Sequence, residues 1–352
     1  MYRALLYPLL TLLGGCSFLV FGEASERADD PVIKGINYIS ITVNNLDEAT
    51  NIFADVADLQ VVDERKMTQI PGSESLLGRK KFTAQTRMMR SHNAQLRFVQ
   101  FEDAHQSRKT YPKVDVYGPG VAHVAFQVNE ETSAYSKFLT AGAKPVNGTP
   151  NMITLNPDNP VEYAYARDAN QTMYEFEHVD FSKLDRDTPP KYDYRIRHVA
   201  LATPDFDRIV KFYSILLEQK QPRRLGRLIN LQGENFDNVS GLADTKLKMA
   251  FFNVRNMELE IAQYVSHPTK LPKKPRPLDA PGFAMIVFDV EDLDAARAIL
   301  ITAGGSIVSE AERMDNGQMM VARDPDGNLL GFQKLDPKSI FSSQNFDGDG
   351  TS

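Results

Sequence analysis

The sequence predicts an α+β protein assembled from four copies of one structural unit, and two pairs of similar segments indicate this. Residues 38–46 (YISITVNNL) resemble residues 198–206 (HVALATPDF), and residues 119–128 (PGVAHVAFQV) resemble residues 281–290 (PGFAMIVFDV). Because the two segment types alternate, the chain divides into modules A, B, C and D, in which A resembles C and B resembles D. Internal repetition of this kind constrains the architecture more strongly than any local motif.

Each module is expected to contain one strand, one helix and then about three further strands. In module A (residues 33–102), residues 36–43 are rich in strand-forming residues, and residues 46–59 carry apolar residues at helical spacing. Later strands are expected at residues 82–90 and 95–101. Module A therefore sets the order of elements that the other modules repeat.

The remaining modules show the same order. In module B (residues 119–180) and module D (residues 281–336) the helix is closed by glycine, at Gly142 and at Gly304. The expected elements are strands 122–128, 161–166 and 173–179 with helix 133–140 in B; strands 197–203, 246–252 and 257–264 with helix 206–217 in C (residues 194–264); and helix 293–303 in D. The Gly/Asp/Ser-rich tail, residues 337–352, is expected to be flexible.

The composition is that of an ordinary globular protein, and it excludes one class of partner. The chain has 352 residues, of which 42% are hydrophobic and 24% charged, and its formal net charge is −6. Because no run of Lys and Arg offsets this negative charge, no nucleic acid is expected as a partner. The expected partner is a small-molecule substrate.

The N-terminus has the pattern of an export signal. Arg3 is followed by a charge-free apolar run, residues 4–21, and a small-x-small pattern ends at Ala24. Residues 1–24 are therefore predicted to direct export to the periplasm. Alternatively, Leu-Gly-Gly-Cys16 is a lipobox, and a lipidated Cys16 anchors the protein to a membrane. Cys16 is the only cysteine, so no disulfide is expected. A membrane contact is expected only through this signal or anchor.

Polar turns late in modules B and D carry a family resemblance. Asp324-Pro-Asp-Gly-Asn328 in D, and the weaker Asp168-Ala-Asn-Gln-Thr172 in B, resemble the turn before the last strand of vicinal-oxygen-chelate (VOC) modules. That superfamily includes glyoxalase I, methylmalonyl-CoA epimerase, extradiol dioxygenases and the bleomycin and fosfomycin resistance proteins. The resemblance implies βαβββ modules that pair into two cupped mixed β-sheets, in which a cup can surround a divalent metal.

The resemblance also implies which residues bind that metal, because the family's ligands come from the first and last strands of each module. These positions hold His123 and Glu175 in module B, and His198 and Glu260 in module C. Imidazole and carboxylate together suit one divalent ion such as Zn, Ni, Co, Fe or Mn. The residue types at these four positions therefore suit the metal site that the resemblance implies.

Modules A and D lack such residues, and this predicts how the modules pair. Module A has Tyr38 and Arg97 at the two positions, and module D has Met285 and Gly331. Pairing A with B and C with D would give each cup one histidine and one glutamate, too few to hold a metal. Pairing B with C and A with D collects all four ligands in one cup. A homodimer that exchanges halves would achieve the same result.

Two sets of residues complete the site hypothesis. Glu177 and Glu258 share strand faces with Glu175 and Glu260, so they are the alternative ligands. The other histidines lie outside the ligand positions and are expected at the surface: His92, His105, His178 and His267.

The expected function is that of an exported, metal-dependent lyase or isomerase of the glyoxalase I/epimerase type. The metal would hold two vicinal oxygens of a small substrate, and Glu175 or Glu260 would take and return a proton. One alternative is an Fe(II) extradiol-type dioxygenase, which uses two histidines and one carboxylate. A second alternative is a non-catalytic binding or resistance protein that sequesters a small molecule.

Overall fold

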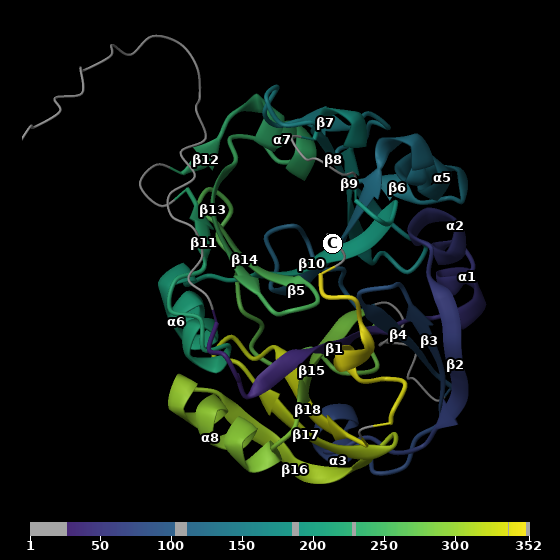
Figure 1. Cartoon of the computed structure of the whole chain (residues 1–352), viewed down its shortest axis with the longest axis vertical. Coiled ribbons are helices and arrows are strands. Elements are labelled where there is room, and N and C mark those ends of the chain that lie inside the picture. The colour runs from purple at the N-terminus through teal and green to yellow at the C-terminus, as the bar shows by residue number, and fades with distance from the viewer. Residues whose placement is uncertain (1–26, 103–110, 185–189, 227–229, 337, 350–352) are drawn as a thin grey trace, which may run out of the picture.

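The computed structural model describes residues 27–102, 111–184, 190–226, 230–336 and 338–349. In these parts of the chain the strands form two mixed sheets, one in the upper and one in the lower half of Figure 1. The predicted export signal lies outside the described residues. Within the described residues, no helix has the length and apolar character needed to span a bilayer.

Modules B and C together form the first sheet, whose ten strands run in the order β11-β13-β14-β10-β5-β9-β8-β6, with β12 and β7 at its margins. Their first strands, β5 and β10, pair antiparallel at the centre, and each also pairs in parallel with the last strand of its own module, β9 or β14. The strands are β5 (Gly120–Asn129), β6 (Lys144–Pro145), β7 (Ile153–Thr154), β8 (Val161–Arg167), β9 (Met173–Val179), β10 (Tyr194–Ala202), β11 (Arg223–Leu225), β12 (Leu231–Gln232), β13 (Lys246–Asn253) and β14 (Glu258–Tyr264).

Modules A and D form the second sheet in the same way. Its eight strands run in the order β16-β17-β18-β15-β1-β4-β3-β2, and the first strands β1 and β15 pair antiparallel at its centre. The strands are β1 (Ile33–Thr42), β2 (Gln60–Met67), β3 (Ala84–Arg90), β4 (Gln95–Phe101), β15 (Gly282–Val290), β16 (Ser306–Met314), β17 (Gly317–Arg323) and β18 (Leu329–Leu335). The predicted α+β fold and the predicted pairing of B with C and A with D are confirmed, and the pairing occurs within one chain.

Although the strands pair B with C and A with D, the helices pack between sequence neighbours. Helix α2 (Phe53–Ala57) of A contacts α5 (Ala134–Thr140) of B, and α6 (Phe206–Leu216) of C contacts α8 (Leu293–Ala303) of D. Figure 1 shows α6 and α8 at the left and α2 and α5 at the right. The Phe53 ring lies 5.7 Å from that of Phe126 on β5 and 6.2 Å from that of Phe138 on α5. One hydrophobic core is therefore shared by all four modules.

Some helices differ from the prediction. The helix expected over residues 46–59 is broken into α1 (Leu46–Thr50) and α2, and α2 ends at Asp58, whose φ of 50° is left-handed. Two short helices that were not predicted, α3 (Ser73–Leu77) and α7 (Glu234–Ser240), both end at a left-handed glycine. Single turns of 3-10 helix occur at η1 (Glu130–Thr132), η2 (Phe181–Lys183) and η3 (Ser343–Asn345).

The prediction of a flexible tail is wrong for residues 338–349. Ser343 is buried, and its backbone N–H donates to Asn37 Oδ1 and Asp289 Oδ2, both at 2.9 Å. Phe341 and Phe346 are buried as well. Two aromatic side chains and a buried carboxylate that needs hydrogen-bond donors therefore outweigh the turn-forming composition of this segment.

Candidate metal centre

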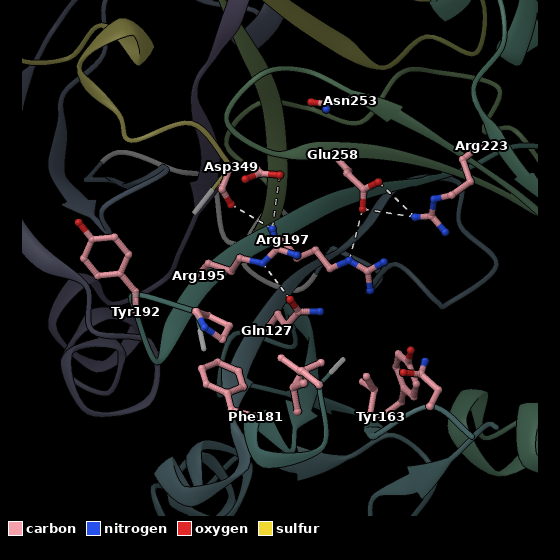
Figure 2. A pocket seen from close by; sticks show the side chains of 15 residues that line it. Gln127, Tyr163, Phe181, Tyr192, Arg195, Arg197, Arg223, Asn253, Glu258 and Asp349 are labelled. Atoms are coloured by element: carbon pink, nitrogen blue, oxygen red, sulfur yellow. Dashed lines mark hydrogen bonds and ion pairs between the residues drawn. The ribbon is translucent and has the colours of Figure 1, made fainter. Parts of the chain in front are cut away.

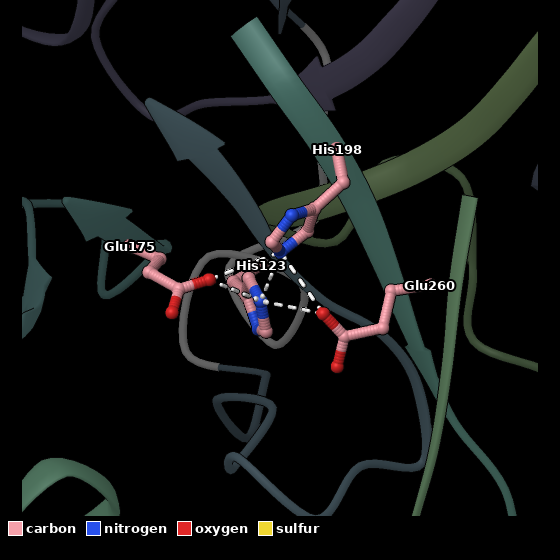
Figure 3. A group of neighbouring side chains, drawn as sticks. All are labelled: His123, Glu175, His198 and Glu260. Carbon is pink, nitrogen blue, oxygen red and sulfur yellow. Dashed lines mark hydrogen bonds and ion pairs between the residues drawn. The ribbon is translucent and has the colours of Figure 1, made fainter. Parts of the chain in front are cut away.

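The four predicted ligands lie on the four central strands of the B/C sheet. His123 is on β5, Glu175 on β9, His198 on β10 and Glu260 on β14, and these strands are adjacent in the order β14-β10-β5-β9. Figure 3 shows the carboxylates of Glu175 and Glu260 approaching the two imidazoles from opposite sides. The structure thus brings together residues that are spread over two modules of the chain.

Their ligand atoms converge on one small volume. The Nε2 atoms of His123 and His198 are 3.1 Å apart. Glu175 Oε2 lies 3.1 Å from His123 Nε2 and 3.0 Å from His198 Nε2. Glu260 Oε2 lies 3.0 Å from His198 Nε2 and 3.9 Å from His123 Nε2. All four side chains are buried, and the four ligand atoms lie within 4.8 Å of one another.

Small residues in the strand register leave room for this cluster. Ala200 is the partner of His123 across the β5–β10 pair, and Ala125 is the partner of His198. The same two alanines lie beside the glutamates, since Ala125 pairs with Glu175 and Ala200 with Glu260. Because a methyl group stands where a larger side chain would fill the centre, both imidazoles and both carboxylates can turn towards one point.

A divalent cation suits this arrangement better than hydrogen bonds alone. Bonds from zinc to nitrogen and oxygen are about 2.1 Å long, so ligand atoms bonded at right angles lie about 3.0 Å apart and tetrahedral ones about 3.4 Å apart. The separations between imidazole and carboxylate atoms, 3.0 to 3.9 Å, fall around these values. Glu175 Oε2, although close to both imidazoles, makes no hydrogen bond of acceptable geometry. A buried carboxylate without donors is costly, and a bound cation removes that cost.

The electrostatics of the site favour an anionic Glu175 and a protonated His198. Burial raises the pKa of Glu175, but its contacts with His123 and His198 outweigh burial and shift the pKa below its usual range. Burial lowers the pKa of His198, but Glu260 and Glu175 outweigh it and raise that pKa to about 10. In the absence of a cation the His198 imidazole therefore holds a proton that balances carboxylate charge, and binding of a metal is expected to release that proton.

The two alternative glutamates are engaged elsewhere. Arg197 Nη1 donates to Glu177 Oε1 at 2.5 Å, and Gln127 Nε2 donates to Glu177 Oε2 at 2.7 Å. Arg223 Nη2 donates to Glu258 Oε1 at 3.1 Å. Because both carboxylates already hold guanidinium groups, Glu175 and Glu260 are the glutamates available to a metal.

The corresponding cup of the A/D sheet is filled by other contacts. Arg97 donates to Tyr38 Oη at 3.0 Å and to both carboxylate oxygens of Asp315, at 3.0 and 2.7 Å. At Gly331 an added Cβ would come within 3.1 Å of Met285 Sδ. Arg97, Met285 and Gly331 offer no oxygen or imidazole ligand, so an ion pair and apolar packing stand at the positions that hold the candidate ligands in the B/C sheet.

The other histidines do not all lie at the surface. His178 is buried, which contradicts the prediction, and its Nε2 accepts a hydrogen bond from the backbone N–H of Tyr135 at 3.1 Å. His92 is half-buried and stacks on Tyr192 at a centroid distance of 3.8 Å, and His267 is half-buried beside Tyr117. His105 lies outside the described residues.

Sequence reasoning missed charged residues in both cups. In the A/D cup, Asp315, the partner of Arg97, lies in the turn between β16 and β17 and belongs to no motif. Arg195 and Arg197 line a cavity beside the metal cluster. Alternation along a strand predicts Arg195 and Arg197 on the face opposite to His198, and the register shift between Ile196 and His198, which the sequence does not reveal, brings them to the same face.

Comparisons with known proteins agree with this fold. The model of the Glyoxalase/Bleomycin resistance protein/Dioxygenase superfamily matches residues 35–156 and 195–332. The structure of glyoxalase I from Zea mays is similar, with a TM-score of 0.56 and 15% identity, over 85% of this chain and 92% of that one. A putative dioxygenase from Bacillus subtilis gives a TM-score of 0.55 and 13% identity, over 88% and 87% of the two chains. No curated protein matches this sequence significantly. At such identities the structural likeness concerns the fold alone.

Proposed function

This chain belongs to the Glyoxalase/Bleomycin resistance protein/Dioxygenase superfamily, and from that premise we propose that it is a metal-dependent lyase or isomerase of the glyoxalase I/epimerase type. His123, Glu175, His198 and Glu260 would hold one divalent metal ion, and the substrate would be a small molecule with two vicinal oxygens. The observation that carries the proposal is the convergence of these four buried side chains from four adjacent strands.

The bound ion would supply Lewis acidity, which polarises a substrate carbonyl and makes the neighbouring C–H more acidic. The protein's own contribution is to move the proton. Glu175 or Glu260 would accept the proton from the substrate carbon and return it to the same or the adjacent carbon. The two carboxylates have different surroundings, because Glu175 pairs with Tyr165 on β8 and Glu260 pairs with Phe251 on β13. One of them can therefore serve mainly as a ligand and the other as the proton carrier.

Burial of the site supports this role. Tyr165 and Tyr264 are buried in the apolar cluster beside the four ligands, and the Tyr165 ring lies 4.9 Å from that of His123. Burial, followed by the carboxylates of Glu260 and Glu175, raises the pKa of Tyr264, so this phenol stays neutral. Neutral, apolar walls keep water away from a carbanion-like species and strengthen the electrostatic contacts inside the site.

The test combines metal analysis with isotope exchange. The purified protein should contain about one divalent ion per chain by inductively coupled plasma mass spectrometry. In D2O, the metal-loaded protein should introduce deuterium at the carbon next to the carbonyl in one member of a panel of small α-hydroxy ketones and 2-oxo acids. Metal-dependent consumption of O2 would instead assign a dioxygenase. Absence of bound metal after reconstitution with Zn, Ni, Co, Fe and Mn would refute the proposal and leave a binding protein.

A further inference from the structure

The concave face of the B/C sheet continues beyond the four ligands into an arginine-lined cavity of about 380 Å³. Volumes of this order are typical of small-molecule sites. The cavity is lined by Arg195, Arg197, Arg223, Gln127 and Glu258, among other residues. Figure 2 shows Arg195 and Arg197 side by side, with Gln127 below them and Glu258 between Arg197 and Arg223.

The strand register places this cavity next to the metal cluster. Glu258 precedes Glu260 by two residues on β14 and faces the same side of the sheet. Two residues of a strand span roughly 7 Å. Arg197, directly before His198, forms the boundary, since it contacts Glu177, and Glu177 Oε1 lies 3.9 Å from His198 Nδ1. The interval between the two sites therefore has about the length of a molecule of a few carbon atoms.

The sheet residues that line the cavity carry more positive than negative charge. Arg197 contacts Glu177 and Glu258, and Arg223 shares Glu258 with it. The third guanidinium, that of Arg195, donates to the neutral amide of Gln127 at 2.9 Å. Three cations therefore face two carboxylates on the sheet.

The remaining anion comes from the C-terminal segment. Arg195 Nη1 donates to the backbone carbonyl of Asp349 at 3.0 Å, and Asp349 Oδ2 lies 3.9 Å from the same nitrogen. Asp349 is half-exposed and reaches the cavity from outside the sheet. Its carboxylate thus supplies, from a separate segment, the negative charge that the cavity wall lacks.

We propose that this cavity binds an anionic group, a carboxylate or a phosphate, of a small acid whose other end reaches the metal site, and that Asp349 occupies the cavity when the acid is absent. This inference rests on the proposed function, because it names the class of substrate for that same site. Guanidinium groups recognise carboxylate and phosphate through paired, charge-assisted hydrogen bonds. Arg195 and Arg223 would contact the anion, and Arg197, held by Glu177 and Glu258, would position it.

The first test compares two acids that differ only in distal charge. In calorimetric titrations of the Co²⁺-loaded protein, 2-oxoglutarate should bind about tenfold more tightly than 2-oxopentanoate, which has the same chelating end and an uncharged tail. Arg195→Gln and Arg223→Gln should each remove most of this preference. Arg297→Gln, which removes a surface arginine on α8 paired with Glu310, is the matched control and should keep it. Equal affinity of the unmodified metal-loaded protein for both acids would overturn the inference and leave the proposed function intact.

The second test needs no metal, so it separates the two proposals. Inorganic phosphate should bind the metal-free protein, and Asp349→Asn should tighten this binding several-fold because it removes a competing charge while keeping the backbone carbonyl. Arg223→Gln should weaken the binding of phosphate about tenfold. Identical phosphate affinity in Arg195→Gln, Arg223→Gln and the unmodified protein, each with an unchanged circular dichroism spectrum, would show that the cavity is not an anion site.

Discussion

At the scale of single residues, the two imidazoles decide whether the site can hold a metal. His123→Ala or His198→Ala removes a buried nitrogen ligand, so metal content should fall from about one ion per chain towards zero. Tyr38→Phe is the matched control, because Tyr38 occupies the position of His198 in the other sheet. It should retain the metal. Loss of metal in Tyr38→Phe together with retention of metal in His123→Ala would show that the metal is bound by the A/D sheet and not by the B/C sheet.

The two glutamates should differ in their effects. Glu175→Gln and Glu260→Gln each keep the shape of the side chain and remove its charge. The variant that lacks the proton carrier should keep most of its metal and lose roughly 10²–10⁴-fold in proton-transfer rate. The other variant should lose metal and activity together. Metal stoichiometry and deuterium incorporation, measured on the same preparations, distinguish the two, and equal losses of both quantities in both variants would contradict the division of roles.

That the four candidate ligands come together could be predicted from the sequence, but their surroundings could not. His123 and His198 occupy equivalent places in repeated segments, so their meeting followed from symmetry between modules. Asp315 pairs with Arg97 from a turn 218 positions away, and its φ of 54° belongs to a tight turn with no repeated counterpart. A contact that only one module makes cannot be found by comparing the sequences of the modules.

At the scale of elements, the buried His178 acts as a cap for helix α5. The residue before this helix, Ser133, has a left-handed φ of 54° and makes no side-chain hydrogen bond to the helix. The backbone N–H of Tyr135, which lies in the first turn, donates instead to the His178 imidazole on β9. A histidine distant in sequence thus replaces the usual N-cap residue, and only its neutral form can accept this hydrogen bond.

This cap predicts how stability depends on pH. Burial lowers the pKa of His178 from 6.5 to about 4. The unfolded chain therefore binds more protons between pH 6.5 and 4, and the stabilisation, complete above pH 6.5, is lost as pH falls through that window. The free energy of unfolding should decrease by up to about 2 kcal/mol between pH 7.5 and 5 from this residue.

Urea unfolding at the two pH values measures this effect. His178→Gln keeps an acceptor for Tyr135 but does not titrate, so the variant should show a smaller decrease between pH 7.5 and 5. His92 provides an internal comparison, because burial lowers its pKa to about 4 as well. An unchanged pH dependence in His178→Gln would mean that the imidazole does not contribute through its protonation.

At the scale of the whole molecule, the two sheets should respond independently to substitutions in their cups. Asp315→Asn leaves the guanidinium of Arg97 without its buried counter-ion, which typically costs about 3–5 kcal/mol. Chemical denaturation should show a loss of that order, whereas metal content should not change, because the four ligands lie in the other sheet. Loss of the metal at full stability would indicate that the A/D cup takes part in metal binding.

Export is a further prediction at this scale, and it rests on the pattern of residues 1–24. Sequencing of the N-terminus of protein made in its host should reveal cleavage at or after Cys16 and no later than Ala24. A blocked, membrane-bound Cys16 would select the lipid-anchored form over free periplasmic protein. An intact Met1 on protein recovered from the cytoplasm would refute export.

The pairing of the modules also sets the order in which the two sheets can form as the chain emerges. The four ligand strands are complete once β14 has been made, at Tyr264, whereas module A waits for β15 to β18, which end at Leu335. The sheet of modules B and C can therefore form before the sheet of modules A and D is complete. Chains generally fold domain by domain as they emerge, whether from the ribosome or, for an exported chain, on the far side of the membrane. We therefore expect the four candidate ligands to come together while module A still exposes the edge of β1, and we expect this half-finished state to be the one most exposed to aggregation.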